Sequence, residues 1–137
     1  MDELIRCILL GTHPQQFSGL TEAILLRKPL SGRGLRVVTE NLPPSLICEV
    51  LEISKPQLSK LYAKTLSRAQ TEQISSLAKL WINLEEFFNG DRDMLDSWLD
   101  DPIPVLGGVP RDLISTFAGR RAVEDYIGRV RYGDLSL

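Results

Sequence analysis

The chain has 137 residues, of which 43% are hydrophobic and 25% are charged, a size that suits one domain or two very small units sharing a core. Its formal net charge of -2 is too small for the chain as a whole to attract a polyanion. No apolar run approaches the roughly 18 residues of a membrane span, and the opening MDELIRCILL lacks the pattern of a signal peptide. We therefore expect a soluble, cytoplasmic protein that does not enter a membrane.

The N-terminal third has the weakest structural pattern. Residues 2–10 and 20–28 have helical periodicity, whereas His13-Pro14, Pro29 and Ser31-Gly32 are typical of breaks. The chain has two cysteines, Cys7 and Cys48, which are far apart in apolar, helix-like surroundings. This predicts two reduced thiols, with a disulfide as the alternative.

Three short helices are expected next, the first at about residues 34–41. LPPSLICEVLE has an apolar face after a Pro-Pro start, and PQLSKLYAKTL has another that runs to Leu66. Ser54 and Gln57 have the spacing of a capping box before the later helix. Two short helices joined by a few residues are typical of a helix-turn-helix, which we place at about residues 43–66.

The later helix of this pair carries the candidate DNA contacts. The chain between Ser54 and Arg68 has basic residues and no acid. Lysines contact DNA phosphates, and glutamine can read an adenine edge. The predicted DNA-binding set is Lys55, Gln57, Ser59, Lys60 and Lys64. The alternative is a lysine-bearing helix pair that only faces water.

The strongest helical pattern is TEQISSLAKLWINLEEFFNG. Its apolar residues recur at steps of three and four: Ile74, Leu77, Trp81, Leu84 and Phe88. A capping box of Ser67 and Gln70 marks its start, and Asn89-Gly90 marks its end. We expect residues 67–90 to be a long helix that connects an N-terminal helical region, residues 1–66, to a C-terminal unit, residues 91–137.

The C-terminal unit is predicted as short helices around an irregular loop. DRDMLDSWLDD begins with a capping Asp91, and PIPVLGGVP has too many prolines and glycines for a regular element. VPRDLISTFAG has Pro110 in a first helical turn, and GRRAVEDYIGRVRYG is a final helix that stops at Gly133. Because no strand pattern is strong anywhere, the expected fold class is all-α.

Catalytic and metal-binding patterns are missing from the sequence. The single histidine, His13, precedes a proline, and neither cysteine has a plausible catalytic partner nearby. There is no C-x-x-C or H-E-x-x-H motif and no glycine-rich phosphate loop. The sequence therefore predicts no enzyme, no cofactor and no metal site, and it favours a binding protein.

Residues 98–133, WLDDPIPVLGGVPRDLISTFAGRRAVEDYIGRVRYG, resemble the toxin-binding region of the Xre/MbcA/ParS antitoxins. That region has a Trp-Leu and a proline, a Leu-Gly-Gly, a proline before a helical turn, and a Gly-x-x-x-Val helix that ends near a glycine. The matching positions are Trp98, Leu99, Pro102, Leu106, Gly107, Pro110, Leu113, Thr116, Gly119, Val123, Ile127, Arg129, Tyr132 and Gly133. With an Xre-like helix-turn-helix included, the resemblance covers about residues 35–133.

The resemblance implies an antitoxin of a type II toxin–antitoxin system. Such proteins bind and neutralise a RES-domain toxin, an enzyme that resembles ADP-ribosyltransferases and consumes or transfers from NAD. They cover or enter its NAD pocket with their C-terminal region, and many form homodimers, bind operator DNA and repress their own operon. The alternative is a DNA-binding transcriptional regulator without a toxin partner.

Two sets of C-terminal residues follow from this interpretation. The expected toxin-binding set lies on the loop, the last helix and the tail: Leu106, Arg120, Tyr126, Arg129, Arg131, Tyr132, Gly133, Asp134, Leu135 and Leu137. The expected structural set packs the unit: Trp98, Leu99, Pro110, Leu113, Gly119 and Val123. In the tail, carboxylates would meet the cations of an NAD pocket and leucines would fill its apolar parts. The alternative is a frayed chain end that contacts nothing.

Overall fold

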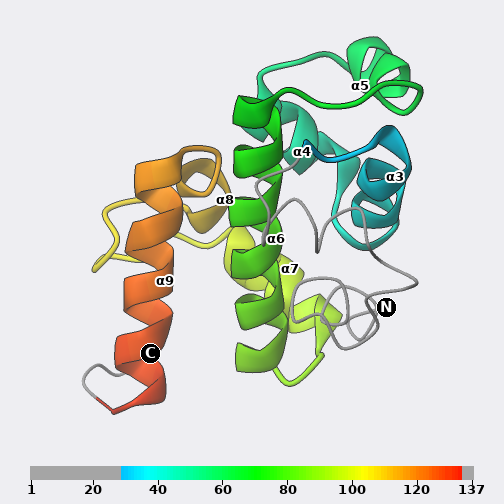
Figure 1. Ribbon diagram of the computed structural model, residues 1–137. Helices are drawn as coiled ribbons and strands as arrows, with labels where there is room; N and C mark the ends of the chain where they lie inside the picture. The colour runs from blue at the N-terminus through cyan, green and yellow to red at the C-terminus, as the bar shows by residue number, and fades with distance from the viewer. Residues whose placement is uncertain (1–28, 134–137) are drawn as a thin grey trace. The chain divides into compact units, whose positions relative to one another are not determined.

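Figure 1 shows a computed structural model of the chain, which describes residues 29–133. These residues form seven helices and no strand, which confirms the predicted all-α class. The helices expected at 2–10 and 20–28, together with Cys7 and His13, lie outside the described residues. Within the described part, none of the helices has the length and apolar character needed to cross a membrane.

The chain divides into two compact units, residues 1–79 and 80–137. The first contains α3 (Gly32–Asn41), α4 (Pro44–Leu51), α5 (Lys55–Leu61) and most of α6 (Arg68–Phe87). The second contains the rest of α6 with α7 (Arg92–Leu99), α8 (Pro110–Leu113) and α9 (Phe117–Arg131). The boundary between the units falls inside the expected connecting helix of residues 67–90. α6 therefore contributes buried side chains to both units, from Thr71 in the first to Glu85 in the second.

The start of α3 corrects the break predicted at Ser31-Gly32. Ser31 is the N-cap, and its Oγ accepts a hydrogen bond from the Gly34 amide at 3.1 Å. A Cβ at Gly32 would lie 2.2 Å from the carbonyl oxygen of Tyr62. Only glycine therefore lets the first turn of α3 approach the end of α5 this closely.

The α4–α5 pair confirms the two short helices predicted in this region. Both arms of the expected capping box form: Gln57 N donates to Ser54 Oγ at 3.3 Å, and Ser54 N donates to Gln57 Oε1 at 2.7 Å. The later helix ends at Leu61, however, and does not reach Leu66. Leu66 N instead donates to Leu30 O at 2.8 Å, so pairing with the segment before α3 ends the helix early.

The core of the first unit gathers aliphatic side chains from α3, α4, α5 and α6. Those with 0% or 1% exposure are Leu30, Leu35, Val38, Leu46, Ile47, Ile74 and Leu77. Leu30 N also donates to Thr71 Oγ1 at 2.8 Å inside this core, which ties the chain before α3 to α6. Cys48 is a buried free thiol.

Both ends of α6 follow the sequence prediction. Gln70 N donates to Ser67 Oγ at 3.1 Å, and Ser67 N donates to Gln70 Oε1 at 2.9 Å, which confirms the capping box. At the other end, Asn89 and Gly90 have φ angles of 54° and 77°. Gly90 N donates to Glu85 O at 2.9 Å, so the left-handed turn satisfies a terminal carbonyl of the helix.

Candidate functional site

Trp98 lies in the interior of the second unit and is 8% exposed. Its ring centroid is 5.5 Å from that of Phe88 and 6.4 Å from that of Tyr126, on which it stacks. Its indole N–H has no hydrogen-bond partner among residues 29–133, so apolar contacts hold the ring in place. Trp98 and the fully buried Leu99 thereby attach α7 to its neighbours.

A buried carboxylate holds the start of α7 against α6. Glu85 is 4% exposed, and its Oε1 accepts a hydrogen bond from the Trp81 indole at 2.8 Å. Arg92 Nη1 lies 3.6 Å from the same oxygen, and the Arg92 guanidinium lies 5.2 Å from the Trp81 ring centroid. The sequence analysis assigned no role to Glu85. The four-residue spacing from Trp81 to Glu85 was the signal that could have revealed the pair.

The proline- and glycine-rich loop between α7 and α8 is fastened at both ends. Asp100 Oδ1 accepts from Arg111 Nε at 2.8 Å, and this hydrogen bond holds the pKa of the Asp100 carboxyl below its usual value. Ile103 N donates to Gly108 O at 3.0 Å and closes a short hairpin. Val105, at 63% exposure, lies in this hairpin, and the predicted contact Leu106 is partly exposed beside it.

The junction of α8 and α9 depends on a glycine. Pro110 is buried as the first residue of α8, and the Thr116 side chain caps α9 by accepting from Gly119 N at 3.0 Å. A Cβ at Gly119 would lie 1.7 Å from Leu113 O, so any larger residue would force the two helices apart. Val123, one turn later, is fully buried. The members of the predicted structural set on α8 and α9 thus lie along this packed side.

Two residues of the predicted toxin-binding set, Arg120 and Tyr126, are buried inside the second unit. Arg120 is 1% exposed, and its Nη1 donates to Ile114 O at 2.9 Å. Burial lowers the pKa of the Arg120 guanidinium, and the nearby Glu124 carboxylate partly opposes this shift. Tyr126 is 5% exposed beneath Trp98. Neither side chain offers a surface to a partner, so both support the unit from within.

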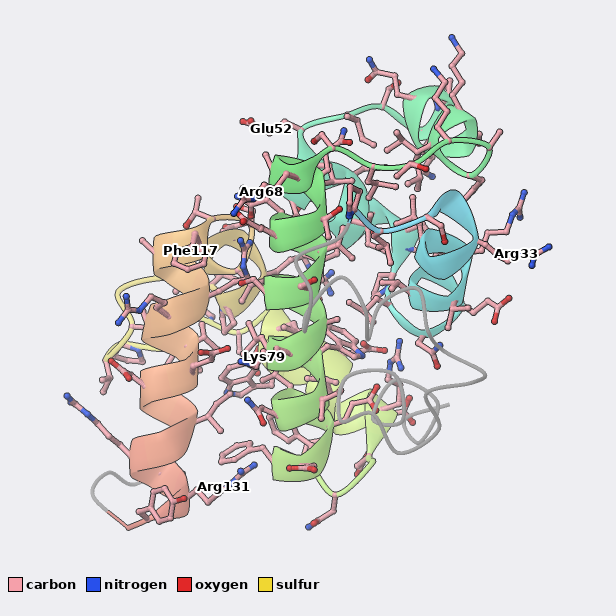
Figure 2. The ribbon with its side chains drawn as sticks, in the orientation of Figure 1. Arg33, Glu52, Arg68, Lys79, Phe117 and Arg131 are labelled. Carbon is pink, nitrogen blue, oxygen red and sulfur yellow. The ribbon has the colours of Figure 1, made fainter. Side chains whose placement is uncertain are left out.

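The end of α9 is exposed and precisely placed. Arg131 Nη2 donates to the carbonyl oxygen of Asn83 on α6 at 3.3 Å, and Figure 2 shows Arg131 at this end of the helix. Tyr132 is 82% exposed, and Gly133 turns the chain with a φ of 82°. Arg129 is exposed on the same last turns. The predicted contacts Asp134, Leu135 and Leu137 lie outside the described residues.

The predicted DNA-binding residues are all exposed: Lys55, Gln57, Ser59, Lys60 and Lys64. Gln57 Oε1 also accepts the hydrogen bond of the capping box from the Ser54 amide at 2.7 Å. Lys64 lies in the turn after α5 and not on the helix.

Comparison with known proteins identifies relatives of this chain. Residues 83–133 match the family described as the antitoxin Xre/MbcA/ParS C-terminal toxin-binding domain. The chain is 27% identical over 142 residues to the "Prs ADP-ribosylating antitoxin" of Sphingobium sp. (strain YBL2), which covers 90% of this chain and 89% of the relative. It is 31% identical over 68 residues to "Antitoxin Xre" of Photorhabdus laumondii, which covers 49% of this chain and 46% of that protein. No solved structure matches the chain significantly.

Proposed function

We propose that this chain, an antitoxin of the Xre/MbcA/ParS type, neutralises a RES-domain toxin by blocking its NAD pocket with the C-terminal region. The observation that carries the proposal is the exposed end of α9, where Tyr132 and Gly133 lead directly into the tail. The toxin-binding domain match extends to this same point, residue 133. The name of the Sphingobium relative refers to ADP-ribosylation of Prs, which favours a toxin that transfers ADP-ribose.

The chemistry of the tail suits a pocket built for NAD. Such a pocket must neutralise a pyrophosphate dianion, so cationic donors should line it. The Asp134 carboxylate would meet those cations, while Tyr132, Leu135 and Leu137 would occupy the places of the flat and apolar parts of NAD. Arg129 would pair with acids at the mouth of the pocket. Arg131 would fix the direction in which the tail leaves α9, because it is bonded to α6.

Deletion of residues 134–137 tests this proposal. We expect a chain that ends at Gly133 to keep its helical content and melting temperature, because it keeps every buried core residue found within residues 29–133. It should nevertheless restore NAD consumption by the co-purified toxin or abolish the complex. A chain with Gly-Ser-Gly-Ser at 134–137 is the matched control, since it keeps the length of the tail and removes its chemistry. Full inhibition by the truncated chain would contradict the tail mechanism and move inhibition to the Leu106–Arg120 segment.

The alternative of a transcriptional regulator without a toxin is less well supported. A regulator without a toxin would not need a toxin-binding domain, whereas residues 83–133 match one. Co-expression with the protein encoded by the adjacent open reading frame separates the two functions. We expect a stable complex on affinity purification and size exclusion. Failure of the two proteins to associate would contradict the toxin proposal.

We also propose that the first unit binds operator DNA as a homodimer and represses its own operon. Lys55 and Lys60 on α5 and Lys64 after it are exposed, and Arg33 and Arg36 are exposed on α3. Figure 2 shows the Arg33 side chain extending away from the body of its unit. The Arg36 guanidinium lies 4.3 Å from the Tyr62 ring centroid, which holds this cation between α3 and the end of α5. Such a surface suits phosphate contacts more than base recognition.

The salt dependence of promoter binding tests the DNA proposal. Replacing both Lys60 and Lys64 by alanine should weaken binding and lower the slope of log affinity against log salt by about 0.9 for each lost phosphate contact. Lys79→Ala is the matched control, because it removes an exposed lysine of α6 outside the predicted set. Toxin neutralisation should be unchanged in both the double variant and the control. Absence of promoter binding by the native protein at low salt, with and without toxin, would exclude the DNA role.

A further inference from the structure

The last helix contains a glycine that the packing of residues 29–133 does not require. Gly128 lies inside α9, and a Cβ built on it meets no atom of these described residues within 4 Å. Gly119 in the same helix is the opposite case, since its Cβ would lie 1.7 Å from Leu113 O. Glycine is the least favourable ordinary residue in a helix interior because it loses the most backbone freedom on folding. The packing of the described residues gives no compensating gain for Gly128.

Gly128 shares one face of α9 with two exposed aromatic side chains. With about 100° of rotation per residue, positions 117, 121, 128 and 132 fall within roughly 60° of one another around the helix. Phe117 is 56% exposed and Tyr132 is 82% exposed, whereas Val123, Tyr126 and Ile127 are buried on the other side. The two aromatic residues lie about 22 Å apart along the helix, with Gly128 between them. Figure 2 shows Phe117 at the start of α9 and Arg131 near its end.

We infer that this outer face of α9, from Phe117 to Tyr132, is a docking surface for the toxin and that toxin backbone passes over Gly128. The inference rests on the proposed function and adds the surface that holds the toxin while the tail enters its pocket. The face ends at Tyr132, two residues before the tail at 134–137 in the sequence, and it lies wholly within the toxin-binding domain match at 83–133. Exposed aromatic residues are typical anchors of protein interfaces, and a glycine allows close backbone approach.

Substitutions at Gly128 separate a binding role from a folding role. We expect Gly128→Ala and Gly128→Leu to raise the melting temperature of the free full-length chain by about 4 °C, because both residues favour a helix. The same variants should bind the toxin of the proposed function, prepared as the protein encoded by the adjacent open reading frame, less tightly. The loss should be about three-fold for alanine and about ten-fold or more for leucine, measured by calorimetry. A loss of affinity in a more stable protein cannot arise from misfolding.

Ser97→Ala is the matched control, because position 97 is exposed on α7 and alanine is also the better helix former there. It should raise the melting temperature slightly and leave toxin affinity unchanged.

If Gly128→Leu bound the toxin with unaltered affinity, the docking surface would be overturned. The proposed function would still stand in that case if the tail deletion released the toxin. A lowered melting temperature would also overturn the docking surface, since Gly128 would then serve packing. The inference would also be overturned if the Gly128 variants associated with themselves more weakly but kept their toxin affinity, because the face would then bind a second copy of this chain. If the native chain does not bind the RES-domain protein, the inference falls with the proposed function.

Discussion

The two units of the chain expose different kinds of side chain. The large hydrophobic residues that are exposed within residues 29–133 all belong to the second unit: Met94, Val105, Phe117 and Tyr132. The first unit exposes lysines and small polar groups along α5. Single apolar side chains are normal on a protein surface. Their restriction to one of two units is not expected by chance and calls for an explanation. This difference is the reason for proposing a protein partner for the second unit and a polyanion for the first.

Both units combine local helix caps with contacts between residues far apart in the sequence. In the first unit, Ser31 and Ser54 cap helices locally, and Leu30 N bonds to Thr71 across 41 positions. In the second, Asp91 caps α7 locally, and Arg131 bonds to Asn83 across 48 positions. Removal of one central distant contact should impair the function of a unit more than removal of one cap. The predictions below test these two kinds of contact, beginning with the largest effect.

Trp98→Ala should produce the largest change. Truncation of a buried aromatic side chain leaves a cavity and typically costs about 3–5 kcal/mol of unfolding free energy. We expect a much lower melting temperature and loss of toxin neutralisation, with Trp98→Phe retaining most of both. Unchanged stability together with lost binding would instead make Trp98 a direct toxin contact. If promoter binding fell as steeply as toxin binding, the units could not be treated as separate in function.

Gly119→Ala should be the next most severe change. The added Cβ would overlap Leu113 O at 1.7 Å, so α8 and α9 must separate. We expect a cost of about 2–3 kcal/mol, as for other overpacked sites, measured by urea unfolding. Gly128→Ala provides the same chemical change in the same helix with open space around it. Equal stability of the two variants would show that the close α8–α9 junction is not required.

Ser54→Ala tests the local character of the first unit. It removes one arm of the capping box of α5, and loss of an N-cap typically costs about 1 kcal/mol. Promoter binding should weaken because α5 presents Lys55 and Lys60, whereas toxin affinity should stay at its native value. Ser97→Ala in the second unit is the control for a serine that forms no helix cap. Reduced toxin affinity of Ser54→Ala would contradict the independence of the two surfaces.

Asp100→Asn should give the smallest effect. The Arg111 hydrogen bond lowers the pKa of the exposed Asp100 carboxyl from its ordinary value of 3.8. Stability from this pair is therefore present above pH 3.8 and is lost as the pH falls through the lowered pKa. We expect the native protein to melt slightly above the variant at pH 7 and at the same temperature near pH 2. A difference that persists unchanged at low pH would exclude the ion pair as its cause.

The sequence by itself determined the helices and most of their ends. The capping boxes at Ser54 and Ser67, the cap at Asp91 and the stop at Gly133 all depend on residues within a few positions of one another. The ordered motif from Trp98 to Gly133 was likewise sufficient to indicate a resemblance to the toxin-binding domain of the Xre/MbcA/ParS antitoxins, whose family model residues 83–133 match. Local hydrogen bonds and glycine conformations act over one helical turn, so they can be recognised in a linear pattern.

Only the tertiary structure decided which polar and aromatic residues face inward. Arg120 and Tyr126 had the residue types of binding groups, yet both are buried, because a neighbouring carbonyl satisfies the arginine and Trp98 covers the tyrosine. The early end of α5 also depends on Leu30, which pairs with a segment far along the chain. Such contacts join residues that are distant in sequence, and their burial depends on how helices pack, which no spacing within one helix encodes.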